Sequence, residues 1–358
     1  MASIENLILQ VKRNCNISDA KYWGTYSICG LLLRLRKLYR IENNIMPWER
    51  SDRADIGRWI EERERMWQKL EVNDFEKLLI GDSEYQPFDV ENINRAIKKQ
   101  GLVYSAGYGR FMKPLFFIAD LLCSKSIEGL DIYIAGREYA RDLSDSPSML
   151  LEKSIFARLD AMRNLLWEKF EELKMRGAKG VLSFSFSEYG VNSMEELSEH
   201  VYNHISFIAQ AELDAYIYHE IGEAFAGRAI GKDWKEMIAN IGSPKAELFV
   251  RAVKDVMSDT IEQGMLKHII DTQKAGSLGF YIAFLGDYRR LVFNDITIAF
   301  DEFIKSKDWN IIEKARKSGY KKAMGYAEAL LNLYRKTSDN TEMAGYIERE
   351  ILAKLKYT

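Results

Sequence analysis

The chain has 358 residues with a formal net charge of −2, and hydrophobic residues make up 47% of it. This composition is typical of a globular protein, and the lack of a basic excess argues against nucleic-acid binding. The three cysteines lie far apart and show no CxxC spacing, which favours reduced thiols in a cytoplasmic protein over a disulfide framework. No apolar run approaches ~18 residues, so we expect neither a membrane helix nor a signal peptide.

The first hundred residues carry the pattern of helices. Proline is disfavoured inside helices, and only five prolines occur in the whole chain. Residues 18–43 begin with Ser18 as a candidate N-cap and continue with leucines at helical spacing. These leucines are Leu31, Leu32, Leu35 and Leu38. Residues 46–70 are predicted to form a further helix, whose apolar face includes Trp59 and Trp67.

The middle of the chain combines predicted loops, helices and two short strands. Residues 101–114 are rich in Gly and Tyr and are predicted to form a loop, which is followed by an apolar helix over 114–122. Residues 131–135 form a β-type run, and 136–177 carry a helical pattern. Residues 181–187 alternate apolar residues with Ser, which predicts a half-buried strand. Two such short runs limit the expected β structure to a small two-stranded element.

From Ser193 onward the pattern is almost entirely helical. The predicted helices are 193–230, 232–241, 244–275, 277–306, 308–336 and 339–356. We therefore expect a mainly α, multi-helical fold with a C-terminal helical bundle. The Gly-containing break near 176–192 predicts an N-terminal helical unit with the short β element, residues 1–178, and a C-terminal bundle, residues 179–358.

Residues 199–225 are the most informative part of the chain for function. They contain three of the four histidines, and their second half is dominated by apolar residues, so a helix there is expected to be buried. Several titratable side chains nevertheless fall in that half. They are Glu212, Asp214, His219, Glu220 and Glu223. A carboxylate in an apolar interior is costly unless it is paired, protonated or bound to a cation, so this pattern indicates a site.

His219 and Glu223 lie one turn apart on the same face of the predicted helix. The i, i+4 spacing resembles the HExxH motif of zinc proteases, but Glu223 replaces the second His and the resemblance covers only five residues. We expect His219 and Glu223 to bind Zn, Fe or Mn, with Glu220 as the general base. Glu212, two turns before His219, would bind nearby or support the ligands.

One helix does not complete a metal site, so further ligands must come from another segment. His200 lies 19 residues from His219, about 28 Å along a continuous helix, and is therefore excluded. The candidate donors on the predicted helices 244–275 and 277–306 are Glu262, His268, Asp287, Asp295 and Asp301.

Arg137 and Arg141 form a second candidate site. One turn apart on the predicted helix, their guanidinium groups could hold a phosphate or carboxylate of a small-molecule substrate in a bidentate manner. The alternative is a set of intrahelical ion pairs with the neighbouring Glu138 and Asp142.

These features predict a metal-dependent enzyme, with hydrolytic chemistry favoured over oxidative chemistry. The metal would lower the pKa of a bound water so that Glu220 draws its proton at neutral pH. The alternative is a non-catalytic helical binding or scaffold protein, in which the same side chains form a buried polar network. In that network the histidine would bond to a carbonyl or Tyr, and each buried Glu would pair with an arginine. The available arginines include Arg251, Arg289 and Arg290.

Overall fold

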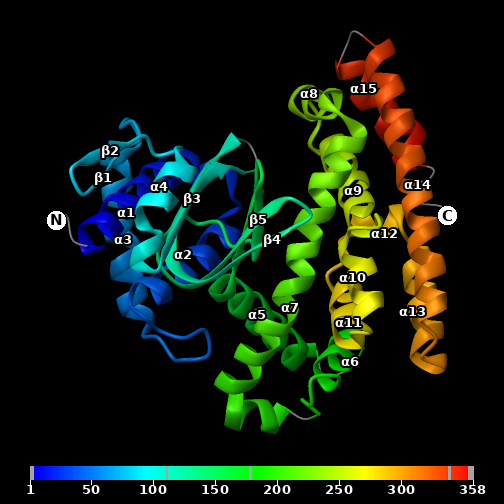
Figure 1. Cartoon of the computed structure of the whole chain (residues 1–358), viewed down its shortest axis with the longest axis horizontal. Helices are drawn as coiled ribbons and strands as arrows, with labels where there is room; N and C mark the ends of the chain where they lie inside the picture. Colours follow the sequence, from blue (N-terminus) through cyan, green and yellow to red (C-terminus); the bar gives the residue numbers. More distant parts are fainter. Residues whose placement is uncertain (1–3, 110–111, 177–179, 193, 338–339, 354–358) are drawn as a thin grey trace. The chain divides into compact units, whose positions relative to one another are not determined.

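The computed structural model describes residues 4–109, 112–176, 180–192, 194–337 and 340–353. Backbone contacts divide the chain into two units, and Figure 1 shows the order of their elements along the chain. The first unit comprises Met1–Lys169 and Val201–Leu213, and the second comprises Phe170–His200 and Asp214–Thr358. Among the helices that the structure describes, none combines the length and the apolar character that a membrane span requires.

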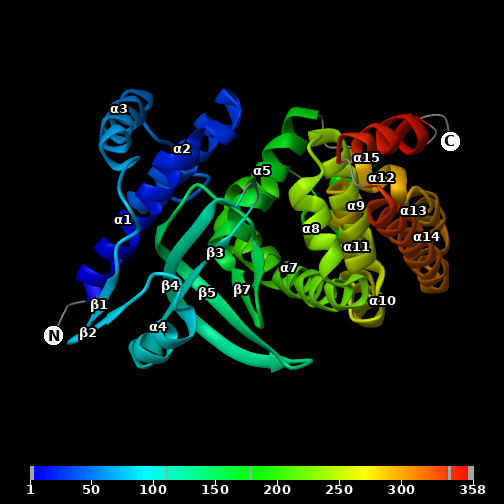
Figure 2. The same ribbon diagram turned by 90° about the horizontal axis from the view of Figure 1, so that it is seen from above.

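The first unit contains a five-stranded sheet in the order β3-β4-β5-β7-β6. Its strands are β3 (Leu102–Tyr108), β4 (Pro114–Ile127), β5 (Leu130–Arg141), β6 (Ser148–Leu151) and β7 (Ser154–Arg158). Neighbouring strands are antiparallel except β5 and β7, which are parallel. Figure 2 shows that β4 and β5 form a long, curved hairpin. A second sheet pairs β1 (Leu78–Ile80) with β2 (Ser83–Tyr85).

The prediction of a mainly α fold with at most a small two-stranded element is therefore wrong, although most described residues are helical. The predicted loop 101–114 contains β3, and the predicted helix 114–122 is the first part of β4. This part of β4 is apolar without a period of two because both of its faces are covered. Phe116 packs on one side of the sheet and Phe117 on the other.

The helices of the first unit lie against this sheet or against one another. They are α1 (Ile4–Tyr22), α2 (Ile28–Glu42), α3 (Arg53–Leu70), α4 (Val90–Ile97) and the first part of α5 (Leu159–Arg176), with the short 3-10 turns η1 (Trp23–Thr25) and η2 (Lys98–Gln100). Leu7 and Val11 of α1 and Ile93 of α4 pack against Tyr104 and Ile118 of the sheet. The other face carries Val103, Phe117, Ala119, Ala135 and Phe156, which form a cluster of their own.

Side-chain amides from helices take the place of a neighbouring strand at several positions. Asn94 of α4 donates to the carbonyl of Tyr104 at 2.7 Å and accepts from its N–H at 2.8 Å. Asn14 of α1 makes the same pair of bonds with the backbone of Glu76, both at 2.8 Å. Buried backbone groups need such partners, and an edge that is already paired does not recruit another chain.

In the second unit, every described element of secondary structure is a helix or a helical turn. Its elements are α6 (Val181–Ser187), most of α7 (Met194–Ile230), α8 (Lys232–Asn240), α9 (Pro244–Thr260), α10 (Met265–Thr272), α11 (Ala275–Ala283), α12 (Asp287–Val292), α13 (Asp295–Ser306), α14 (Trp309–Lys336), α15 (Asn340–Tyr346) and a π-helical turn (Ile347–Leu352). The α9 helix begins with Ser243 as N-cap and Pro244 in the first turn, as predicted. It lies beside α14 in the core of this unit (Figure 1).

The predicted strand 181–187 is the helix α6. Its serines are tolerated in a helix because their hydroxyls bond to backbone carbonyls, as Ser185 does with Val181 at 2.9 Å. The helix packs closely on α11, where a Cβ at Gly279 would lie 2.4 Å from the Ser185 hydroxyl oxygen. The alternation of Phe and Ser therefore reflects aromatic packing between helices and not a strand.

The amide pairing at the sheet edge predicts a selective loss of stability. Changing Asn94→Ala leaves the N–H and carbonyl of Tyr104 without partners and should lower the free energy of unfolding by about 1–3 kcal/mol. Urea unfolding followed by circular dichroism measures this change. The control is Asn92→Ala, because Asn92 is exposed on the same helix and bonds only to neighbouring side chains. Equal stability of the two variants would contradict the proposed edge pairing.

Candidate functional site

The helices α7 and α9 approach each other at backbone distance. A Cβ placed on Gly222 of α7 would lie 2.1 Å from the carbonyl oxygen of Ser258 on α9, which is far inside contact distance. Only glycine allows this approach. The side chains one turn from Gly222 therefore meet those next to Ser258, and these positions include His219 and Asp259.

His219 forms an ion pair with a buried carboxylate at this crossing. Its Nδ1 lies 2.6 Å from Oδ1 of Asp259, whose side chain is completely buried. The second oxygen of Asp259 lies 3.7 Å from Nη1 of Arg289. The Tyr281 side chain is also buried, and burial together with the negative charge of Asp259 raises the pKa of its hydroxyl well above 10.

The ion pair determines the charge of His219. Burial alone lowers the pKa of an imidazole, but the adjacent carboxylate of Asp259 outweighs burial and raises the pKa of His219 to about 10. The side chain is therefore an imidazolium at neutral pH. Metal coordination requires a neutral imidazole, so the pairing with Asp259 opposes the ligand role that the sequence suggested for His219.

Glu223 is paired in the same region of α7 and α9. Lys254 Nζ lies 2.8 Å from Oε2 of Glu223, and although burial raises the pKa of this carboxyl, the ammonium group brings it below its ordinary value. Asp255, half-buried on α9, faces the same cluster, and burial raises its pKa. Two charged pairs, His219–Asp259 and Glu223–Lys254, thus connect α7 to α9.

Of the other predicted members of the site, Glu220 acts on this cluster, because its negative charge helps to raise the pKa of His219. Glu212 is buried, but it lies on the Val201–Leu213 segment of α7, which packs in the first unit. Glu220 is also buried. Among the described residues, no group of three or more His, Cys, Asp or Glu side chains could hold a metal ion. The described residues therefore show no metal site of the kind that the sequence pattern predicted, and the expectation of a metal-binding protein is corrected to that extent.

The expected donors from other helices have different partners. Glu262 pairs with Arg316 at 2.7 Å, and the ring of His268 stacks on Tyr218 with centroids 4.0 Å apart. The side chain of Asp287 lies outside the described residues. The residues that the sequence argument missed are Lys254 and Asp259 on α9. Their signal was present, because Asp255 and Asp259 repeat on α9 the i, i+4 spacing of His219 and Glu223 on α7.

Arg137 and Arg141 lie on strand β5 and not on a helix. Arg137 is exposed and its guanidinium lies over the ring of Tyr139, 5.3 Å from the centroid. Arg141 is buried, and its Nη1 lies 3.3 Å from Glu138. The two arginines therefore have different environments and different partners. The spacing that would align them on a helix does not bring them together on a strand.

A β-bulge explains why Glu138 and Arg141 meet. Opposite β4, Arg141 pairs with Phe117 and Glu138 pairs with Ala119, with one extra residue accommodated at Tyr139. Phe117 and Ala119 belong to one face of the sheet, so the bulge directs both charged side chains to that face. Without it, residues 138 and 141 would point to opposite faces.

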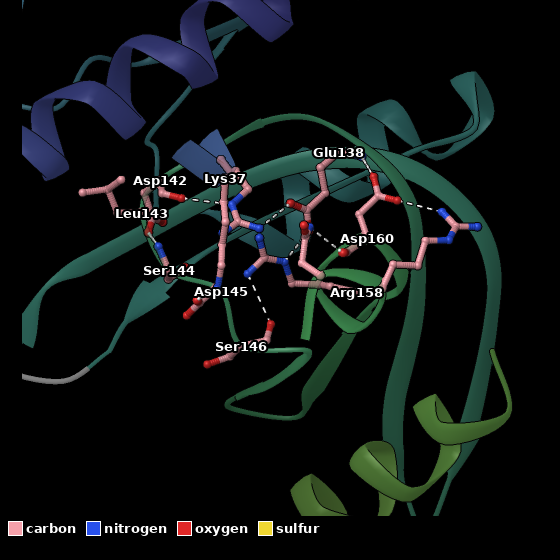
Figure 3. Close-up of polar contacts among 12 residues, drawn as sticks. Lys37, Glu138, Asp142, Leu143, Ser144, Asp145, Ser146, Arg158 and Asp160 are labelled. Atoms are coloured by element: carbon pink, nitrogen blue, oxygen red, sulfur yellow. Dashed lines mark hydrogen bonds and ion pairs between the residues drawn. The ribbon is translucent and has the colours of Figure 1, made fainter. Parts of the chain in front are cut away.

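Glu138 is shared between two guanidinium groups in this cluster (Figure 3). Oε1 accepts from Nε of Arg158 at 2.7 Å, and Oε2 accepts from Arg141. Although burial raises the pKa of Glu138, the two arginines hold it below its ordinary range. The backbone N–H of Glu138 donates to Asp160, which also accepts from Arg163 at 2.8 Å. Arg141 thus has a counterion within the unit, so its guanidinium group is not free to bind a substrate as the sequence suggested.

The comparison with protein families covers nearly the whole chain. Residues 6–158 match the N-terminal domain, and residues 163–353 match the C-terminal domain, of a family of unknown function, DUF6866. The chain belongs to this family. The two matched ranges meet at the start of α5, and the His219–Asp259 ion pair lies in the C-terminal domain of this DUF6866 member. No curated protein and no solved structure matches the chain.

The ion pair of His219 predicts a specific dependence of stability on pH. Because the folded-state pKa of about 10 exceeds the ordinary 6.5, the stabilisation is complete below pH 6.5 and is lost as the pH rises toward 10. NMR titration of imidazole-labelled protein should show one histidine protonated at pH 8. Asp259→Asn should bring the pKa of that histidine down toward its ordinary value. A titration midpoint near 6.5 in the unaltered protein would refute the pairing.

The helix crossing predicts opposite effects of two glycine substitutions in α7. Gly222→Ala forces α7 away from Ser258 and should destabilise the protein by about 1–3 kcal/mol, because a packed interior resists added volume. Gly227→Ala meets open space on the same helix and should stabilise it by roughly 0.5–1 kcal/mol. Chemical denaturation of both variants tests the pair. If Gly222→Ala were as stable as Gly227→Ala, the close approach would be ruled out.

Proposed function

We propose that this DUF6866 member acts as a non-catalytic binding or scaffold protein whose buried charges fix its packing. The observation that carries the proposal is the pairing of the residues with catalytic potential. His219 is bonded to Asp259 at 2.6 Å and Glu223 to Lys254 at 2.8 Å. Both side chains that would bind a metal in a hydrolase or oxidase already have counterions from the neighbouring helix.

The buried charges of the first unit support the same proposal. Lys113, which precedes β4, bonds through Nζ to Asp19 of α1 at 2.7 Å and approaches Asp142, after β5, at 3.5 Å. All three side chains are buried. Removing one member of such a group leaves an uncompensated charge in the interior, which costs several kcal/mol. The group thus holds three distant segments in one arrangement, which suits a rigid binding platform.

A measurement of metal content and stability separates this proposal from the metal-dependent enzyme. The purified protein should contain no stoichiometric Zn, Fe or Mn, and its melting temperature should not respond to EDTA or to added Zn or Mn. His219→Ala should lower the free energy of unfolding at pH 7 by about 3–5 kcal/mol, because Asp259 then loses its counterion. Elemental analysis and differential scanning fluorimetry provide the data.

The matched control for that measurement is Glu223→Gln. An amide at this position keeps a hydrogen bond to Lys254, so this variant should fold and should have the same metal content as the unaltered protein. If the unaltered protein carries one equivalent of a metal that both variants lose, the two side chains are ligands. The binding-protein proposal then fails.

A further inference from the structure

The first two turns of α2 present apolar side chains to solvent. Ile28 is 78% exposed, Leu33 55% and Leu32 45%, and Trp23 in the turn before the helix is 49% exposed. We call these four residues the α2 face. Scattered exposed apolar residues are ordinary, but several on adjacent positions of one helix form a contiguous patch, which is typical of an interaction site.

The α2 face is distinct from the side of the helix that packs in the unit. Ile28, Leu32 and Arg36 follow one another at intervals of four and form one stripe. Leu35 and Leu38 are buried in a cluster with Trp67, on the side of the helix that adjoins this stripe. The helix is therefore apolar on two adjoining sides, of which one is buried and the other is exposed. Only one of these sides is needed for folding.

The surroundings of the α2 face are positively charged. Between Asp19, which is buried, and Glu42 the chain has no acidic residue. The basic residues of this interval are Lys21, Arg34, Arg36, Lys37 and Arg40. Arg34 and Lys37 pair with Asp145. Arg36 is exposed and makes no ion pair within the described structure, so the stripe ends in an uncompensated cation.

We propose that the α2 face binds an amphipathic helix of another protein that carries acidic residues beside its apolar stripe. This inference rests on the proposed binding function and names its partner class. Apolar anchors at i, i+4 spacing match the way in which two helices pack side by side. The apolar stripe of the partner covers Ile28, Leu32 and Leu33, and one of its carboxylates pairs with Arg36.

The charge distribution favours this partner over a lipid surface and over a second copy of the chain. Lipid-binding clusters contain about 4–8 basic residues, whereas only two of the five basic residues between Asp19 and Glu42, Lys21 and Arg36, are exposed. A second copy packed through its own α2 face would bring the same positive charge, and residues 20–41 of that copy contain no carboxylate to pair with Arg36. The first acidic residue after it, Glu42, is already paired with Arg63 and Lys12.

Synthetic helical peptides test the proposal on the full chain. One peptide carries leucines at i, i+3, i+4 and i+7 with glutamates flanking them, and a second has lysine at every glutamate position. The Glu peptide should bind, and the Lys peptide should not. Arg36→Glu should weaken binding of the Glu peptide by about tenfold or more and should create binding of the Lys peptide. Isothermal titration calorimetry measures both affinities.

Control variants keep the result specific to the α2 face. Leu33→Ser should weaken the Glu peptide by about tenfold, as expected for loss of a central apolar anchor. Leu122→Ser changes a leucine of similar exposure on β4 and should have no effect. Exposed cysteines allow a second readout. An environment-sensitive fluorophore on Cys29, in a Cys123→Ser protein, should respond to the Glu peptide, whereas one on Cys123 in a Cys29→Ser protein should not.

Three outcomes would overturn the proposal. The first is equal binding, or no binding, of the two peptides. The second is sedimentation with phosphatidylserine vesicles that Arg36→Glu abolishes. The third is a dimer in analytical ultracentrifugation that Leu33→Ser dissociates. None of these outcomes depends on metal content, so failure of the α2 face and failure of the proposed binding function are separately recognisable.

Discussion

Charges that folding removes from water must find partners inside the protein, and this requirement organises both units of the chain. In the first unit Lys113 is held between Asp19 and Asp142, and Glu138 is shared by two arginines. In the second unit Asp259 takes His219 as its counterion. Each of these groups joins elements that are separate in sequence. Specific ion pairs therefore help to define the fold, in addition to the burial of apolar side chains.

The sequence pattern predicted long helices of the second unit, but it did not predict the five-stranded sheet of the first unit. The long helix predicted over 193–230 is α7 (Met194–Ile230), and the Ser243–Pro244 start of α9 is confirmed. Helices of this length are distinguished by their periodicity. A strand covered on both faces, such as the first part of β4, has no such period, and its apolar run is compatible with a buried helix. In α6 the period of two was present, but packing against α11 decided the outcome.

The sequence predicted that the charged side chains of α7 need counterions. It did not predict which residues supply them. A buried helix with His219 and Glu223 required opposite charge from elsewhere, and the structure supplies Asp259 and Lys254. Nothing local to α7 selects these partners, because the approach of Gly222 to Ser258 brings them within reach. The arginine site failed for a different reason. Its geometry assumed a helical spacing, and the segment is a strand.

The bulge at Tyr139 has a consequence for how this family can vary. Glu138 and Arg141 share a face only because one extra residue separates them along β5. Substitution of Tyr139 by another residue keeps the spacing of Glu138 and Arg141 along β5. A deletion at this position would direct one of the two charged side chains to the opposite face of the sheet, which is apolar. Chain length is therefore more restricted at this position than residue type, so insertions and deletions should be rarer here than amino-acid replacements.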